Sequence, residues 1–251
     1  MKVIIPDWSD APANIGALTS LRSGGVSLAP YDDGSTGRNG LNLAVHVGDN
    51  PEHVLQNRAT LRPLLPSEPV WLTQVHGTNV VNAATATNAP EADASFSTER
   101  GVVCATLTAD CLPVLFCDSK GTVVAAAHAG WRGLADGVLE QTVSQMRAAG
   151  AGDILAWFGP AIGPQSFEVG EDVPDAFVAR SADMRAAFTP KPGQPGKYLA
   201  DIYLLARKTL HKIGVDRISG GGMCTVIDKH RFYSFRRDNI TGRMATLIWL
   251  K

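Results

Sequence analysis

The sequence predicts an α+β fold, and three observations support this prediction. Apolar runs of strand length and helical stretches follow one another without the regular strand–helix–strand rhythm of a doubly wound parallel sheet. The chain has 251 residues, which is within the range of one large domain or two small ones. Hydrophobic residues make up 45% and charged residues 19%, so the chain can bury a sizeable core.

The first third of the chain predicts short strands and one helix. Turn-forming residues are frequent in the first forty positions, which is typical of short strands joined by loops. A helix is expected over residues 51–62, with Asn50 as its N-cap and proline at its first position. Residues 70–75 and 78–81 are expected to be strands that flank His76 and Gly77.

The remainder of the chain predicts further strands and two helices. Strands are expected at residues 102–107, 114–117, 123–127, 154–158 and 246–250, and helical periodicity covers residues 133–150 and 201–213. The segment 191–197, rich in proline and glycine, is the best linker candidate, but it is short enough to be a surface loop. We therefore expect residues 1–251 to form a single catalytic domain.

Composition excludes several classes of protein. The formal net charge is −1, from 23 basic and 24 acidic residues, so we expect no basic face for nucleic acid. No segment approaches the ~20 apolar residues that span a bilayer, and the N-terminal residues do not resemble a signal peptide. Four irregularly spaced cysteines do not make a disulfide framework. These features predict a cytoplasmic protein without membrane or nucleic-acid partners; the sequence does not determine its oligomeric state.

Three segments place polar residues where apolar strands end. They contain His76, Cys111 and His128, each beside glycine or proline, where the backbone turns sharply. Two imidazoles and one thiolate suit Zn²⁺, and three protein ligands with an open fourth position are typical of a catalytic zinc site. Such a site activates bound water as a nucleophile.

The spacing of these residues also permits other interpretations. The same three side chains are equally consistent with a buried thiol and two hydrogen-bonded core histidines. Cys111 is alternatively a nucleophile activated by His76 or His128, without any metal. Asp110 is a candidate either to orient a ligand histidine or to act as an acid or base, and it could equally cap the turn before Pro113.

Three motifs surround the candidate ligands: Gln-Val-His-Gly at 74–77, Ala-Asp-Cys at 109–111 and His-Ala-Gly-Trp-Arg-Gly at 128–133. With these motifs the chain resembles a family that is catalogued as multicopper polyphenol oxidase (laccase-like), purine nucleoside phosphorylase and peptidoglycan editing factor. The resemblance extends over nearly the whole chain, through residues 22–27, 41–43, 47–49, 159–163, 224–225, 232–238 and 241–243. Phe235 stands where the family often has another aromatic residue.

The resemblance implies one zinc ion bound by the histidine, cysteine and histidine of these motifs, which here are His76, Cys111 and His128. It also implies mixed β-sheet layers flanked by helices, a cytotoxic-necrotizing-factor-like fold related to suspected cysteine hydrolases. The implied reactions are phosphorolysis of adenosine, inosine and methylthioadenosine, with adenosine deamination as a further activity. Asp110 is then the candidate acid that delivers a proton to the leaving amine.

Phosphorolysis requires cationic groups for phosphate and polar groups for the nucleoside. Arginine binds phosphate bidentately, and the candidates are Arg22, Arg58, Arg132, Arg236 and Arg237. Arg236 and Arg237 are favoured because they are expected at an aromatic-rich strand end. Asn42 is a candidate to bind a base or ribose edge. The alternative for each arginine is a solvated or salt-bridged surface position, and the alternative for Asn42 is a turn.

Other functions remain open from the sequence. Six histidines are too few to build the four copper sites of a laccase, so polyphenol oxidation and copper are disfavoured. Hydrolysis of an amide in peptidoglycan precursors is an alternative, with metal-activated water or the Cys111 thiolate as nucleophile and a backbone donor near Gly130. A third hypothesis is a binding module in which the three ligands form a structural metal clip.

Overall fold

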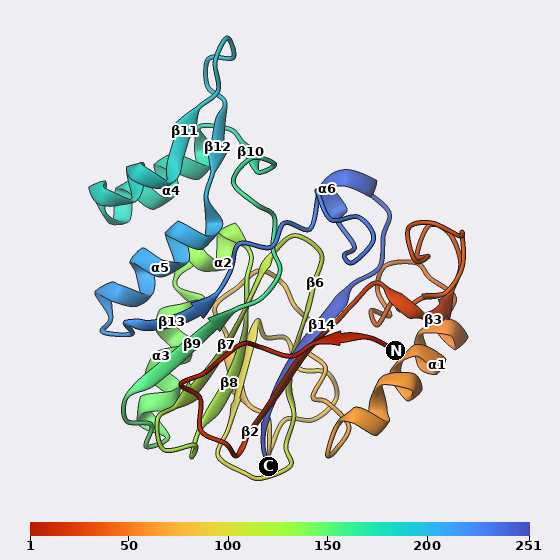
Figure 1. The fold of residues 1–251 in the computed structure, drawn as a ribbon. Coiled ribbons are helices and arrows are strands. Elements are labelled where there is room, and N and C mark those ends of the chain that lie inside the picture. The colour runs from red at the N-terminus through yellow and green to blue at the C-terminus, as the bar shows by residue number, and fades with distance from the viewer.

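Two β-sheets pack against each other at the centre of the molecule (Figure 1). The computed structural model describes all residues, 1–251. The larger sheet has six strands in the order β13-β9-β7-β8-β5-β4. Their bounds, in chain order, are β4 Val80–Asn82, β5 Ala94–Ser97, β7 Leu112–Asp118, β8 Val124–Ala129, β9 Ile154–Phe158 and β13 Arg217–Gly220. The pairs β13–β9 and β4–β5 are parallel and the other pairs antiparallel, so the sheet is mixed, as expected for an α+β fold.

The second sheet is antiparallel and joins both ends of the chain. Its order is β1-β2-β14-β6, with bounds β1 Val3–Ile4, β2 Ile15–Ser20, β6 Cys104–Thr108 and β14 Met244–Leu250. A small third sheet contains β10 Glu168–Val169, β11 Phe188–Pro190 and β12 Tyr198–Ala200 and lies at the top of Figure 1. The short strand β3 Ser23–Ser27 lies beside helix α1.

The α-helices are α1 Pro51–Leu61, α2 Trp131–Asp136, α3 Val138–Ala148, α4 Asp172–Arg180, α5 Ile202–Lys212 and α6 Phe235–Asp238. Helices α2, α3 and α5 cover the side of the six-stranded sheet that faces away from the second sheet (Figure 1). Helix α1 packs against the second sheet. Two 3₁₀ helices, η1 Arg62–Leu64 and η2 Ala182–Ala187, complete the elements. None of these helices has the length and apolar content needed to cross a membrane.

The alternation of side chains along β7 explains why this strand has no polar face. Val114 and Phe116 pack on the helix side of the sheet, in the main core cluster. Leu115 and Cys117 point the other way, into the cluster shared with the second sheet. Because both faces are covered, an unbroken apolar run is required here rather than a strand with alternating polar residues.

Several expected elements are confirmed. The Asn50 side chain accepts a hydrogen bond from the Glu52 amide at the start of α1. Helix α5 begins after Asp201, whose side chain accepts a hydrogen bond from the Leu204 amide. The strands predicted at 114–117, 123–127, 154–158 and 246–250 lie within or overlap β7, β8, β9 and β14. The segment 191–197 is the loop that joins β11 to β12.

Three expectations were wrong. The helical stretch 133–150 is two helices, because Gly137 adopts a left-handed conformation (φ 106°) that ends α2 and begins α3. Residues 70–75 form isolated bridges at Val70 and Thr73 rather than a strand. Arg236 and Arg237 lie in the short helix α6, not at a strand end.

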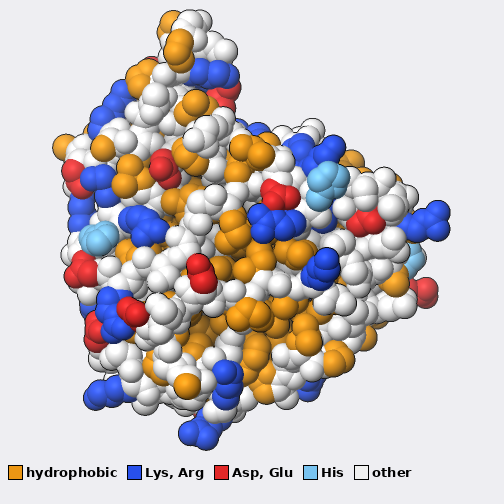
Figure 2. All heavy atoms as spheres, viewed as in Figure 1, with side chains coloured by type: hydrophobic (Ala, Val, Ile, Leu, Met, Phe, Trp, Pro, Cys, Tyr) orange, Lys and Arg blue, Asp and Glu red, His pale blue; other side chains and the backbone are white.

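The molecular surface on the side shown in Figure 2 carries a broad apolar region in its centre and lower part. Basic and acidic side chains are interspersed around it. This face therefore offers no continuous basic surface of the kind that a nucleic-acid backbone requires.

The buried side chain of Asn57 on α1 forms three hydrogen bonds with other segments of the first third of the chain. Its side chain accepts from the Val26 amide at 2.8 Å and donates to Ser27 Oγ and the Asn42 carbonyl, both at 2.9 Å. Asn57→Ala removes all three bonds and leaves the Val26 amide and the Asn42 carbonyl without this partner, while Ser27 Oγ keeps its bond to Asp49. We therefore expect the free energy of unfolding to fall by about 3 kcal/mol. Denaturant titration measures the loss. Gln56→Ala, exposed on the same helix, should change it by less than about 0.5 kcal/mol; equal effects would contradict the prediction.

Candidate metal centre

The pairing of β7 with β8 brings Cys111 and His128 to the same end of the six-stranded sheet. In this antiparallel pair, Pro113 lies opposite His128 and Leu112 opposite Ala129. Cys111 directly precedes β7, and Gly130 directly follows β8. Cys111 and His128 therefore lie at the same end of these two paired strands.

His76 completes a compact cluster with these two residues, as the sequence predicted. The candidate ligand atoms of His76, Cys111 and His128 all lie within 4.8 Å of one another. The Cys111 sulfur lies 3.7 Å from His76 Nε2, and the two imidazole rings meet edge to face at 4.8 Å between centroids. His128 is buried, Cys111 half-buried and His76 exposed, so the cluster opens to solvent on the His76 side.

One distance between candidate ligand atoms, and the donor types of this cluster, fit a zinc ion. In a tetrahedral site with Zn–S of about 2.3 Å and Zn–N of about 2.1 Å, a sulfur and a nitrogen ligand lie about 3.6 Å apart. The separation of 3.7 Å between the Cys111 sulfur and His76 Nε2 matches this value. Two imidazoles and one thiolate are also the donor types that zinc prefers.

Gly130 is required for the close approach of the ligands. A Cβ atom at this position would lie 2.6 Å from His76 Cδ2 and 3.1 Å from the Cys111 sulfur. Any side chain here would therefore displace one of the two ligands. The glycine of the His-Ala-Gly motif is thus explained by space, and not by an unusual backbone angle.

Two residues of the site hold left-handed backbone conformations, His76 (φ 62°) and Asp110 (φ 88°). This region is unfavourable for residues with a Cβ and is maintained only by compensating contacts. The Asp110 carboxylate accepts hydrogen bonds from the Thr225 hydroxyl at 2.5 Å and the Arg236 amide at 2.6 Å. Asp110, which directly precedes Cys111, is therefore connected to Thr225 and to helix α6.

The buried carboxylate of Asp93 lies behind the cluster and changes its electrostatics. Asp93 Oδ1 lies 2.8 Å from His128 Nδ1. Burial disfavours a charged imidazole, but Cys111 and Asp93 outweigh it and raise the pKa of His128. Burial likewise opposes ionisation of Cys111, yet His128 and His76 lower the pKa of its thiol below the usual range. Without a metal, thiolate and imidazolium thus stabilise each other.

A cavity of about 510 Å³ opens in front of the cluster, a volume typical of small-molecule sites. Its polar lining comprises the three cluster residues with Asp110, His46, Gln74, Thr108, Arg132, Arg236 and Arg243. Its apolar lining comprises Leu107, Ala109, Trp131, Ile162, Phe167, Ile202 and Phe235. The cavity thus combines candidate metal ligands, cationic groups and an apolar wall.

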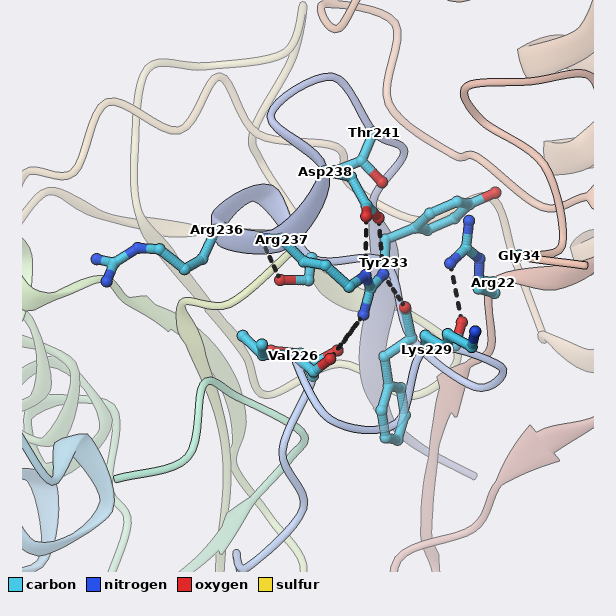
Figure 3. A network of polar contacts seen from close by, with 12 residues as sticks. Arg22, Gly34, Val226, Lys229, Tyr233, Arg236, Arg237, Asp238 and Thr241 are labelled. Carbon is cyan, nitrogen blue, oxygen red and sulfur yellow. Dashed lines mark hydrogen bonds and ion pairs between the residues drawn. The ribbon is translucent and has the colours of Figure 1, made fainter. Parts of the chain in front are cut away.

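The structure separates the sequence-predicted arginines into two groups. Arg132 and Arg236 line the cavity together with Asp110. Arg22 and Arg237 do not line the cavity, and each donates hydrogen bonds to backbone carbonyls of nearby loops. Arg22 donates to the Lys229 carbonyl, and Arg237 donates to the carbonyls of Thr225, Val226 and Phe232. Figure 3 shows that Arg236 and Arg237, although adjacent, extend in opposite directions, and only Arg237 joins this network.

Asn42 and Arg58 also lie outside the cavity lining. Asn42 is fully buried; its side chain donates to the Ala44 carbonyl and Asp49 and accepts from the Ala44 and Arg243 amides. Arg58 donates to the Leu43 carbonyl at 3.0 Å and stacks on Trp71 at 4.2 Å. Both side chains are therefore engaged in holding the loop that precedes α1.

Sequence reasoning did not select His46, Arg243, Gln74 or Asp93 as site residues. Arg243 could have been found, because it ends the Thr-Gly-Arg segment of the family resemblance. Gln74 belongs to the motif of His76, and its side-chain amide forms two hydrogen bonds with the backbone of Leu107. The sequence contains one weak indication of Asp93, a carboxylate between two alanines directly before a strand.

Comparisons with known proteins agree over the full length of the chain. The chain is 54% identical over 253 residues to "Purine nucleoside phosphorylase YfiH" of Escherichia coli (strain K12), covering 99% of each chain. It is 53% identical over 248 residues to "Purine nucleoside phosphorylase PA4543" of Pseudomonas aeruginosa, covering 99% of this chain and 98% of the relative. The crystal structure of Neisseria meningitidis protein NMB0706 is similar with a TM-score of 0.91 and 48% identity, covering 100% of both chains.

A family model described as multi-copper polyphenol oxidoreductase laccase matches residues 16–251, which is nearly the whole chain. This match confirms the resemblance inferred from the motifs. The chain belongs to the multi-copper polyphenol oxidoreductase laccase family.

Proposed function

We propose that the protein is a zinc-dependent purine nucleoside phosphorylase, with residues 1–251 forming one catalytic domain. The observation that supports this proposal best is the composition of one cavity, which combines the His76, Cys111 and His128 cluster with three arginines and an apolar wall. The full-length relatives whose names contain purine nucleoside phosphorylase agree with it. The proposed substrates are phosphate with adenosine, inosine or methylthioadenosine, and adenosine deamination is a further proposed activity.

In this proposal, phosphate binds to the arginines of the cavity. Arg132 stacks on Trp131 at 4.4 Å, and Arg236 lies 5.6 Å from the centre of the Phe167 ring. Arg243 lies 5.9 Å from the centre of the Phe235 ring. Arg236 Nη1 donates to the Glu168 carbonyl at 2.8 Å, and Arg243 Nη1 donates to the carbonyls of Thr241 and Gly242. These bonds and the aromatic rings restrain the two guanidinium groups, and the phosphate would bind to their other N–H groups.

The purine base fits the apolar part of the lining, where Phe235 is half exposed. An aromatic face and aliphatic side chains remove the base from water without specifying one exocyclic group. This property agrees with a range of purine substrates. Discrimination among them would then come from the few polar groups at the edge of the cavity.

The metal would be held by His76, Cys111 and His128 and would supply Lewis acidity and an activated water. Asp110 remains our candidate for moving a proton. Both of its oxygens already accept hydrogen bonds, from Thr225 and Arg236. Its first role is therefore to hold the start of α6 and so place Arg236; proton delivery would require the exchange of one of these bonds.

Hydrolysis of an amide in a peptidoglycan precursor is the second candidate function, and one observation favours it. Cys111 with its lowered thiol pKa, His128 and Asp93 form the arrangement of a cysteine nucleophile, a base and an orienting carboxylate. This arrangement also agrees with the implied relation to cysteine hydrolases. Polyphenol oxidation through copper is disfavoured, because six histidines cannot supply four copper sites.

The phosphorylase proposal predicts phosphate-dependent release of purine base. Purified protein incubated with adenosine should yield adenine only when phosphate is present, because phosphate is the nucleophile. Product separation by chromatography gives the result, and ribose 1-phosphate should appear with adenine in equal amount. Inosine would reveal the deaminase activity. If neither base nor inosine forms under either condition, the purine proposal falls and amide hydrolysis becomes the leading candidate.

Removal of the thiolate tests the role of the metal. Cys111→Ala should abolish both stoichiometric zinc and activity, because two imidazoles alone bind zinc weakly. Metal analysis of the purified variant provides the first measurement. The control is Cys224→Ala, which changes a half-buried cysteine outside the cavity lining and should keep both properties. Retained zinc with lost activity would instead indicate a covalent cysteine mechanism.

The two neighbouring arginines of α6 should separate into binding and structural roles. Arg236→Ala should raise the KM for phosphate by about 10-fold or more, since a hydrogen bond to a charged group is worth ~1.5–3 kcal/mol. Arg237→Ala should instead lower the melting temperature, because the carbonyls of Thr225, Val226 and Phe232 lose a half-buried donor. Phosphate saturation curves and thermal unfolding of both variants check this. An unchanged phosphate KM in Arg236→Ala would contradict the assignment.

A further inference from the structure

We propose that Asp93 is the positioning residue of the metal centre: its one carboxylate fixes the backbone of His76 and the ring of His128 together. The inference rests on the zinc centre of the proposed function and extends it to a residue that is not itself a ligand. Asp93 is fully buried and directly precedes β5. It lies behind the cluster, away from the cavity lining.

The first part of the argument concerns the loop that carries His76. Asp93 Oδ1 accepts a hydrogen bond from the His76 amide at 3.0 Å. Asp93 Oδ2 accepts from the amides of Gly77 at 2.7 Å and Val75 at 3.2 Å. Three successive amides thus converge on one carboxylate, and this offsets the cost of the left-handed conformation at His76.

The second part concerns the ring of His128. The same Oδ1 lies 2.8 Å from His128 Nδ1, and the His128 amide donates to the Asp93 carbonyl at 2.7 Å. A carboxylate can only accept, so Nδ1 carries the proton and donates it to Oδ1. Nε2 is then the nitrogen whose lone pair is available to a metal, and ring rotation is restricted.

One residue therefore couples two ligands that come from different parts of the chain. An aspartate suits this position, because its two oxygens together receive four N–H donors. Asparagine keeps the size but has one acceptor oxygen and a donating NH₂ group. That NH₂ would face either a backbone amide or the His128 Nδ1 proton, so Asp93→Asn should disturb the positions of both histidines.

Asp118 offers a matched control at the opposite end of β7. It is also fully buried and accepts hydrogen bonds from the amides of Thr122 at 2.6 Å and Val123 at 2.9 Å. Asp118 contacts no histidine in this turn, which joins β7 to β8. Asp118→Asn thus reproduces the loss of a buried carboxylate that binds backbone amides, without the contact to a ligand.

The experiment is competition for zinc against a chromophoric chelator, with wild-type protein and both variants. Asp93→Asn should weaken zinc binding by about 10- to 100-fold, the effect typical of groups that orient a ligand histidine. Asp118→Asn should lose stability while its zinc affinity stays at the wild-type value. Unchanged zinc affinity in Asp93→Asn, or equal losses in the two variants, would overturn the inference. A wild-type protein that binds no zinc would overturn the zinc centre itself, and the inference with it.

A second measurement needs no substitution and applies even where Asp93→Asn fails to fold. Nitrogen-15 histidine spectra of the zinc-loaded wild-type protein should show His128 protonated at Nδ1, with Nε2 shifted by the metal. This signature follows from the contact with Asp93 Oδ1 and would not arise from a merely structural carboxylate. Metal on Nδ1 and the proton on Nε2 would overturn the proposed positioning.

Discussion

The antiparallel register between β7 and β8 is the constraint on which the candidate metal centre depends. Every residue of both strands is buried, with Val114 opposite Ala127 on one face and Leu115 opposite Ala126 on the other. A slip by one residue would exchange the two faces of a strand between the helical core and the second sheet. The core therefore holds the register that places Cys111 beside Gly130, and no polar contact in the site has to do so.

At this end of β7 and β8, buried carboxylates stabilise backbone conformations that are otherwise unfavourable. Asp93 receives the amides around left-handed His76, while left-handed Asp110 is tied to Thr225 and to helix α6. The cavity thus combines residues from β6, β8, α2, α5 and α6 with loop residues such as His76 and Asp110. Such preorganisation is what a site needs to place ligand atoms within a few tenths of an ångström.

Much of the fold followed from local chemistry. Proline at the first turn and Asn50 as cap predicted α1, and unbroken apolar runs predicted β7, β8 and β9, because these signals act over a few residues. The single helix expected over 133–150 was wrong at Gly137, where a positive φ breaks a continuous apolar period. Residues 70–75 have strand composition, but the neighbouring strands leave them only isolated bridges. Strand pairing depends on partner strands that are distant in the sequence, so the local sequence does not predict it.

The sequence by itself determined the donor types of the candidate site at His76, Cys111 and His128, and its motifs predicted the family to which the chain belongs. Only the tertiary structure decided which polar residues serve that site. It placed Arg236 in the cavity lining and Arg237 outside it, and it revealed Asp93 behind the two histidines. The physical reason is that the donor type depends only on the residue type. The direction of a side chain and its distant hydrogen-bond partners are decided only when separate segments pack together.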